Sequence, residues 1–323
     1  MKELVLLFYA VLIFPFPGNA QVTELNLASD VWPPFTNVEP HRAFASELVK
    51  ESLGRAGIKS TTQILEFEDV IQGIRSGKYH GSAALWYNEE RDEFLLFSAP
   101  YLQNRLIVVG RKGADVSMKS FADLAGMRVA VVGNYAYGSE VDQAWEVILV
   151  TGNNDQQNLE RLLKEEVDYM LVDALLMEYL LTHQGDEVAR YLEIGSTPLF
   201  KRSLHFAVRK DVEGAQSIID RFNQGIIKMI SDGSYNRILK LNWIQADVDG
   251  DGKLEMVGGN HAGEEAPTSS YNVWFENPDQ GLSTNRFYVN GQIYQGWDTV
   301  PQQYKVQPVS ERPEDFKLMK FSF

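Results

Sequence analysis

Short β-type runs alternate with helical runs along most of this chain, and that alternation limits its possible folds more than any other feature. Residues 23–29, 61–67 and 80–86 have the composition of strands, whereas residues 43–57 and 68–76 repeat apolar positions at helical spacing. Helices between successive strands indicate βαβ units, whose strands pair in parallel. The first part of the chain therefore predicts a βαβαβ unit.

The same alternation continues further along the chain. It predicts strands at 106–109, 127–132 and 169–172 and helices at 138–150, 158–166 and 212–240, the last with a break at 231–234. With 323 residues, the chain is long enough for two or three domains. We therefore expect an α/β protein of two units, each built on a mainly parallel sheet.

The first twenty residues have the pattern of a secretory signal peptide. Lys2 precedes an apolar run over residues 4–16, and small residues stand at Gly18 and Ala20. We predict cleavage after Ala20; an uncleaved membrane anchor is the alternative, but the apolar run is short for a bilayer. The chain has no cysteine, so neither a disulfide nor a lipid-modified cysteine is available. We expect a freely diffusing periplasmic protein.

The composition limits the partners of the chain. Its formal net charge is −14 and its sequence pI is about 4.9. Such a protein repels phosphate backbones and anionic lipid surfaces on average, so no nucleic acid is expected as a partner. A small solute or a cation fits this charge better.

Several short motifs occur in a characteristic order. They are Trp32-Pro33-Pro34-Phe35, Ser76-Gly77-Lys78-Tyr79, Glu90-Arg91, Phe97-Ser98-Ala99-Pro100-Tyr101, the strand run from Val167 to Asp173, Val208-Arg209-Lys210-Asp211 and Asp232-Gly233-Ser234-Tyr235. Each motif is weak alone, but the ordered set resembles the extracellular solute-binding protein family 3, the periplasmic amino-acid-binding components of ABC importers. The resemblance spans residues 23–243. It implies a protein that binds an amino acid or a related small amine or carboxylate and catalyses no reaction.

The resemblance also implies a fold, the two-lobed type II fold of periplasmic binding proteins, in which α/β lobes close about a hinge. The implied division is residues 21–105 for the first part of lobe 1, 106–200 for lobe 2, 201–243 for the return segment of lobe 1, and 244–323 for a C-terminal extension. In the extension, aromatic residues alternate with turn residues, and Asn290-Gly291 is typical of a hairpin turn. We expect a small β-rich unit there.

Two charged residues occupy positions at which the family holds its ligand. Arg91 matches the arginine that binds a ligand carboxylate, and a guanidinium suits this task because it presents two parallel N–H donors to a planar anion. Asp173 matches the carboxylate that pairs with a ligand amino group. A solvated charge at Arg91 and a helix N-cap at Asp173 are the alternatives, and both stay open.

The chain departs from the family in the residues around these two positions. Ala84, Trp86 and Asn88 stand where the family has hydroxyl residues that contact the ligand, and a turn with two phenols replaces a Gly-Thr-Thr turn. The aromatic residues predict a cleft for a larger, aromatic or cationic ligand, unless they only pack within a core. The candidate ligand-binding residues are Arg91, Asp173, Trp32, Phe35, Trp86, Asn88, Tyr135 and Tyr137.

An acidic loop at the start of the extension has the spacing of calcium ligands. Asp247, Asp249, Asp251 and Glu255 take loop positions 1, 3, 5 and 9, and Lys253 at position 7 offers its backbone carbonyl. Gly258 stands at position 12, where an EF-hand requires a bidentate glutamate. We expect calcium in a short loop that is not a full EF-hand; a solvated acidic turn is the alternative.

Two other functions compete with solute capture for import. In one, the protein senses a ligand and docks on a periplasmic receptor instead of the membrane subunits of an ABC importer. In the other, it is a dehydratase-like enzyme on the same scaffold with Asp173 as the acid, although no Ser/His/Asp set or histidine-rich metal spacing supports catalysis. We expect a monomer with no cofactor in the cleft.

Overall fold

The structure, a computed structural model, describes residues 22–38, 42–258, 266–267, 271–272 and 285–305. The predicted signal peptide, residues 1–20, lies outside the described residues. Within the described ranges, no helix is both long and apolar enough to cross a membrane.

The first lobe begins with the predicted βαβαβ unit. Its elements are β1 Glu24–Asp30, α1 Phe44–Arg55, β2 Lys59–Leu65, α2 Phe67–Arg75, β3 Gly81–Trp86, α3 Glu89–Asp92 and β4 Leu95–Phe97. Strand β1 pairs in parallel with both β2 and β3. The apolar positions of α1 face inward because they recur at helical spacing, and Phe44, Leu48 and Leu53 are fully buried.

The second lobe also alternates strands with helices. Its elements are β5 Leu102–Arg111, β6 Arg128–Val132, α4 Ser139–Asp142, β7 Ile148–Gly152, α5 Asp155–Leu163, β8 Tyr169–Asp173, α6 Ala174–Tyr191 and β9 Leu192–Ile194, with a 3-10 turn at Phe121–Leu124. Strand β6 pairs in parallel with β7 and β8. The buried strand β8 ends at Asp173, directly before the first residue of α6.

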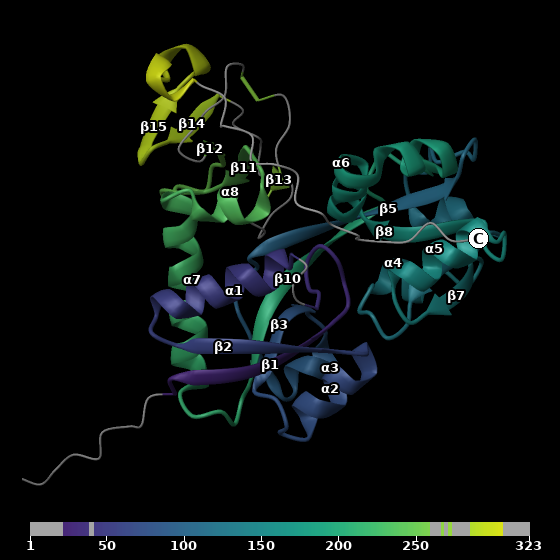
Figure 1. Ribbon diagram of the computed structural model, residues 1–323, viewed down its shortest axis with the longest axis horizontal. Helices are drawn as coiled ribbons and strands as arrows, with labels where there is room; N and C mark the ends of the chain where they lie inside the picture. The colour runs from purple at the N-terminus through teal and green to yellow at the C-terminus, as the bar shows by residue number, and fades with distance from the viewer. Residues whose placement is uncertain (1–21, 39–41, 259–265, 268–270, 273–284, 306–323) are drawn as a thin grey trace, which may run out of the picture.

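Two long strands connect the lobes. Strand β5 and strand β10, Phe200–Arg209, pair antiparallel from Leu102 with Leu204 to Leu106 with Phe200. Beyond this shared segment, β10 pairs with β3 and β4 of the first lobe, and β5 pairs with β8 and β9 of the second. The two lobes therefore share one sheet of order β2-β1-β3-β10-β5-β8-β6-β7, and Figure 1 shows them side by side.

The chain returns to the first lobe after β10. Helix α7, Ala215–Ser231, packs against α1, and α8, Ser234–Leu239, follows the predicted break. The two long helices approach closely at Gly225, where a Cβ atom would stand 2.1 Å from the Ser52 hydroxyl oxygen. The Ser52 hydroxyl donates to the Phe222 carbonyl at 2.7 Å, which fixes the register of α1 on α7.

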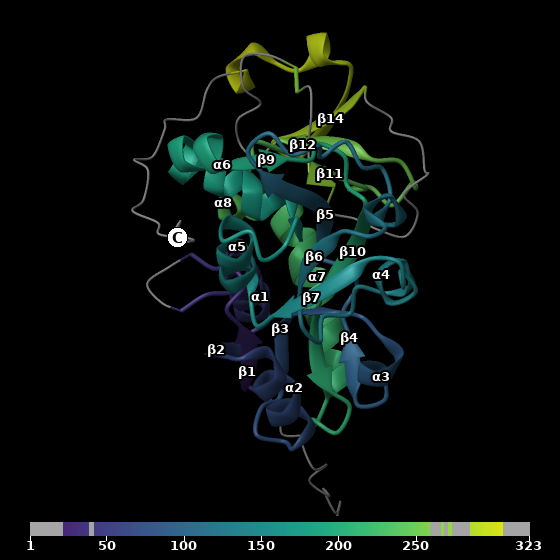
Figure 2. The same ribbon diagram turned by 90° about the vertical axis from the view of Figure 1, so that its right-hand side faces the viewer.

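The C-terminal extension forms a second sheet, which lies at one end of the molecule beyond α8 (Figure 2). Its strands are β11 Trp243–Ala246, β12 Glu255–Gly258, β13 Tyr271–Asn272, β14 Arg286–Val289 and β15 Gln292–Gln295, in the order β13-β11-β12-β14-β15. Two 3-10 turns follow at Trp297–Thr299 and Gln302–Tyr304. A separate apolar cluster of Trp243, Met256, Phe287, Val289 and Val300 stabilises this unit.

The structure confirms the two-lobed α/β fold and the β-rich extension, including the hairpin turn. Asn290 and Gly291 both have positive φ, 49° and 82°, as the turn between β14 and β15 requires. The predicted helix over 138–150 is wrong, because only α4 forms there and the segment ends in strand β7. Strand β7 lies at the edge of the sheet with Ile148 and Leu149 exposed, so its apolar run carries no alternation that marks a strand.

Candidate ligand-binding site

A pocket opens between the two lobes at the ends of β1, β3 and β6. The lining residues are Asp30, Trp32, Phe67, Ala84, Leu85, Trp86 and Arg91 from the first lobe and Tyr135 and Ala136 from the second. Polar and charged groups thus meet aromatic rings at the carboxyl ends of strands, where open α/β sheets place their ligand sites.

Aromatic side chains from both lobes converge on this pocket. The Tyr135 ring lies 5.5 Å from that of Trp32, 5.1 Å from Phe67 and 5.3 Å from Trp86, all in edge-on geometry. We call Trp32, Phe67 and Trp86 the aromatic box. Phe35 is fully buried and supports the box from outside, with its ring 4.5 Å from Trp32.

Arg91 lies buried at the side of the box. Helix α3 positions it, and the Asn88 side chain caps that helix by accepting from the Arg91 backbone N–H at 2.8 Å. The guanidinium donates to the carbonyl oxygens of Trp86 at 2.8 Å and Asn134 at 3.0 Å, and it stacks over Phe67. Burial lowers the pKa of Arg91 to about 10, so the side chain remains cationic at neutral pH. A guanidinium has five N–H donors, and donors therefore remain for a ligand carboxylate.

Asp30 is the acidic group of the pocket. It is the last residue of β1, it is buried, and its carboxylate accepts from the Tyr135 hydroxyl at 2.6 Å. Burial raises the pKa of Asp30 to about 6, although the hydrogen bond from Tyr135 and the charge of Arg91 both oppose this rise.

Asp173 lies away from the pocket lining and serves as a structural cap. Its carboxylate accepts from the backbone N–H of Leu175 at 2.7 Å, which caps α6, and from that of Arg105 at 2.9 Å. It also accepts from the Asn104 amide at 3.0 Å, and Asn104 in turn accepts from the Trp86 indole N–H at 2.8 Å. Asp173 thus connects the second lobe with strand β5 and, through Asn104, with a wall of the box.

Tyr137 is buried beside Trp86, with 5.3 Å between the ring centroids. Its hydroxyl accepts from the backbone N–H of Val132 at 3.0 Å, at the end of β6. Tyr137 therefore shapes the turn that carries Tyr135 and does not itself line the pocket. Of the eight residues predicted from the sequence, the pocket brings together Trp32, Trp86, Arg91 and Tyr135.

Sequence reasoning missed four residues of this region, namely Asp30, Phe67, Asn104 and Asp155. Asp155 is a buried carboxylate in the first turn of α5, and burial raises its pKa to about 7, with Asp30 and Asp173 adding to the rise. Asp30 directly follows a predicted strand and precedes the Trp-Pro-Pro-Phe motif, so the end of that strand was a usable signal. Nothing local marks Asn104, because its role depends on partners 18 and 69 residues away.

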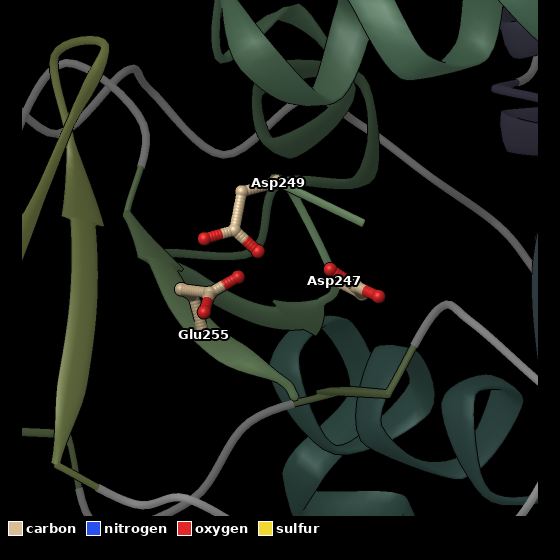
Figure 3. A group of neighbouring side chains, drawn as sticks. All are labelled: Asp247, Asp249 and Glu255. Carbon is tan, nitrogen blue, oxygen red and sulfur yellow. The ribbon is translucent and has the colours of Figure 1, made fainter. Parts of the chain in front are cut away.

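The acidic loop of the extension brings its carboxylates together between β11 and β12. Oxygen atoms of Asp247, Asp249 and Glu255 all lie within 4.8 Å of one another, as Figure 3 shows. The Arg286 guanidinium from β14 pairs with Asp249 and Asp251, both at 2.7 Å, and with Glu255 at 3.0 Å. The Lys253 ammonium lies 3.7 Å from Asp251. A cation from another strand of the chain therefore offsets part of the negative charge of the loop.

Comparison with known proteins identifies the family. The model of the bacterial extracellular solute-binding proteins, family 3, matches residues 25–246, which is more than half of the chain. This chain belongs to that family. The resemblance inferred from the motif order is thereby confirmed, and the chain is a solute-binding protein of an extracellular class.

Two relatives align with more than half of this chain. The probable histidine-binding protein of Campylobacter jejuni is 26% identical over 200 residues, which cover 61% of this chain and 75% of the relative. The probable amino-acid ABC transporter-binding protein of Haemophilus influenzae is 23% identical over 207 residues, covering 64% and 77%. A third relative, the virulence sensor protein BvgS of Bordetella pertussis, is 27% identical over 113 residues, and the match spans 35% of this chain and 9% of the sensor.

Solved structures confirm the two-lobed fold. A mutant of the arginine-binding protein ArgBP from T. maritima superposes with a TM-score of 0.58 at 23% identity, covering 68% of this chain and 94% of that one. The VFT2 domain of Bordetella pertussis BvgS superposes with a TM-score of 0.56 at 20% identity, covering 68% and 92%. The family model ends at residue 246, so most of the C-terminal extension lies beyond the residues that it matches.

Proposed function

We propose that this protein captures an amino acid or a related small amine or carboxylate in the cleft between its lobes and delivers it to the membrane subunits of an ABC importer. The observation that carries this proposal is the interlobe pocket, which joins the Arg91 guanidinium and the Asp30 carboxylate with aromatic rings. A zwitterionic or amphipathic solute finds a partner there for each of its groups. Two relatives, a probable histidine-binding protein and a probable amino-acid ABC transporter-binding protein, support the solute class.

Thermal melts of residues 21–323 against amino acids, amines and small carboxylates test the proposal. A solute at a hundredfold excess over its dissociation constant stabilises the native state by about 2.7 kcal/mol, which shifts the melting temperature clearly. The change Arg91→Ala removes the cation of the pocket and should abolish that shift. Arg75→Ala is the matched control, because Arg75 is an exposed lobe 1 arginine paired with Glu90. If no solute shifts the wild-type melt, the proposal fails.

We also propose that the chain is exported and processed after Ala20, which places the mature protein in the periplasm. The family is extracellular, and the first twenty residues have the signal-peptide pattern. Mass spectrometry of the exported protein should find Gln21 at the N-terminus. A mature protein that retains residues 1–20 would contradict the cleavage site and favour the membrane anchor.

A sensory role is the second candidate, and the superposition on a domain of the BvgS sensor favours it. In that role, the ligand-bound protein docks on a periplasmic receptor, with the extension as part of the contact surface. The extension is joined to the lobes through Tyr288, whose hydroxyl donates to the Ser231 carbonyl at 3.2 Å. Pull-down of one specific receptor, lost on deletion of the extension while solute binding persists, would favour this role over import.

Calcium binding by the acidic loop is a separate proposal. The donor set consists of hard carboxylate oxygens, which suit calcium, and Asp247, Asp249 and Glu255 already point toward one another (Figure 3). Because Arg286 pairs with this cluster, an incoming ion would have to displace its guanidinium. We therefore expect weak binding in the wild type and tighter binding in Arg286→Gln, measured by calorimetry with calcium and with magnesium as the control ion. Equal heats in the wild type, Arg286→Gln and Asp249→Asn would contradict the proposal.

A further inference from the structure

Tyr135 takes an unusual position for a residue of the second lobe, because its ring lies among the aromatic side chains of the first. It belongs to the turn between β6 and α4, yet three first-lobe rings surround it at 5.1 to 5.5 Å. Its hydroxyl donates to Asp30, at the end of β1, at 2.6 Å. The phenol therefore makes the kinds of contact that a bound aromatic solute would make.

The turn that carries Tyr135 is built for this position. Asn134 has a positive φ of 62°, an uncommon conformation for a residue other than glycine, and its carbonyl accepts from Arg91 of the first lobe at 3.0 Å. Tyr137 anchors the other side of the turn through its bond with Val132. Two neighbouring residues of one turn thus make hydrogen bonds across the cleft, Asn134 as the acceptor from Arg91 and Tyr135 as the donor to Asp30.

We propose that Tyr135 is a built-in ligand of this site, whose phenol occupies the aromatic box, hydrogen-bonds Asp30 and holds the two lobes closed when no solute is bound. The inference rests on the proposed function only for the identity of the solute that competes with the phenol. Such a solute has to displace Tyr135, so its apparent affinity is its intrinsic affinity multiplied by the fraction of protein that is open and not occupied by Tyr135.

A distance measurement between the lobes tests the closed state directly. The chain has no native cysteine, so spin labels attach only at introduced sites, and Asp69→Cys on α2 with Gln143→Cys after α4 places one exposed label on each lobe. Double electron–electron resonance without solute should give one short distance in otherwise wild-type protein. Tyr135→Ala should shift the distribution to longer distances, whereas the control Tyr87→Ala, at an exposed lobe 1 tyrosine outside the box, should not.

Chemical rescue then tests the role of the phenol. p-Cresol is the tyrosine side chain without its backbone, and it should bind Tyr135→Ala saturably and return the distances to the short value. Toluene lacks the hydroxyl and should need about tenfold higher concentration, the usual worth of one buried hydrogen bond. Tyr135→Phe, which keeps the ring, should raise the open-to-closed ratio by about the same factor.

The outcomes separate this inference from the proposed function. Wild-type protein that is as open as Tyr135→Ala before any solute is added, or p-cresol that leaves the Tyr135→Ala distances unchanged, would overturn the built-in ligand. If Tyr135→Ala does not fold, the wild-type distance and the change in distance in Tyr135→Phe still test whether Tyr135 holds the lobes closed. A wild type that is closed without solute and binds none of the solutes supports this inference and contradicts the proposed function, whereas one that is open until a solute closes it does the reverse.

Discussion

Replacing Asp173 tests whether its carboxylate contacts the ligand or only caps helix α6. In Asp173→Ala, the backbone N–H of Leu175 loses its cap, which costs about 1 kcal/mol. The Arg105 N–H and the buried Asn104 amide lose their acceptor as well, at about 1 kcal/mol each when no replacement partner is found. Burial also raises the pKa of Asp173 to about 7, so the cost of burying this group opposes that loss at higher pH and is nearly absent near pH 4. At pH 4 we therefore expect the free energy of unfolding to fall by about 3 kcal/mol.

Differential scanning calorimetry at pH 4 measures this loss, which corresponds to a drop in melting temperature of roughly 6 °C for a chain of this size. Asp173→Asn should fall between the wild type and Asp173→Ala, because its oxygen can still cap α6 while its NH₂ group faces two donors. Asp142→Ala, at an exposed carboxylate of the same lobe, is the control and should change the free energy by less than about 0.5 kcal/mol.

The reasoning is refuted by the opposite pattern. If Asp173→Ala keeps the wild-type melting temperature but loses solute binding, the carboxylate contacts the ligand and the cap is incidental. Loss of stability with solute binding retained, measured below the new melting temperature, supports the cap. It would also remove the candidate acid from the dehydratase alternative.

Two further predictions concern stability. Because burial raises the pKa of Asp155 to about 7, the folded state binds the proton of this carboxyl group more tightly than the unfolded chain does. The contribution of Asp155 to the free energy of unfolding is therefore fully present below about pH 4 and is lost as the pH rises through 7. Asp155→Asn should therefore raise the melting temperature at pH 8 but not at pH 4, and a pH dependence equal to that of the control Asp142→Asn would contradict this. Gly291→Ala places a side chain at a φ of 82° and should cost about 1 kcal/mol in urea unfolding. Gly54→Ala, in the exposed last turn of α1 with no atom within 4 Å of the new Cβ, should instead add about 0.5 kcal/mol, and a same-sign result would contradict the backbone argument.

Local patterns were sufficient for most elements of the fold. The helical spacing of Phe44, Leu48 and Leu53 predicts α1, and the Asn290-Gly291 pair predicts its hairpin because few other residues adopt the positive φ angles of that turn. These features depend on neighbours a few residues away. The helix predicted over 138–150 was wrong because the local pattern was missing there: an exposed edge strand has no inward face to impose alternation on its sequence.

The charged groups were harder to place because their partners are distant in the sequence. Asp251 pairs with Arg286, 35 residues later and in another strand. The loop with calcium-ligand spacing therefore has a cationic partner that cannot be predicted from the loop residues themselves. Asp173 stands 69 residues from Asn104, and that distance concealed the network that makes it a cap. A motif can indicate which groups a loop offers, but the fold decides which of them are already satisfied.

The aromatic residues of the cleft show the same distinction most clearly. A phenol beside a carboxylate suits a binding pocket equally well as a wall that contacts the ligand and as a group that takes the ligand's place. Composition and spacing are identical in the two cases, so only the contacts of Tyr135 separate them. A hydroxyl 2.6 Å from Asp30 and a ring within 5.5 Å of three others satisfy the polar and the apolar part of the site together. A solute that enters this cleft must therefore replace both kinds of contact at once, because offering only one of them leaves either Asp30 or the box without a partner.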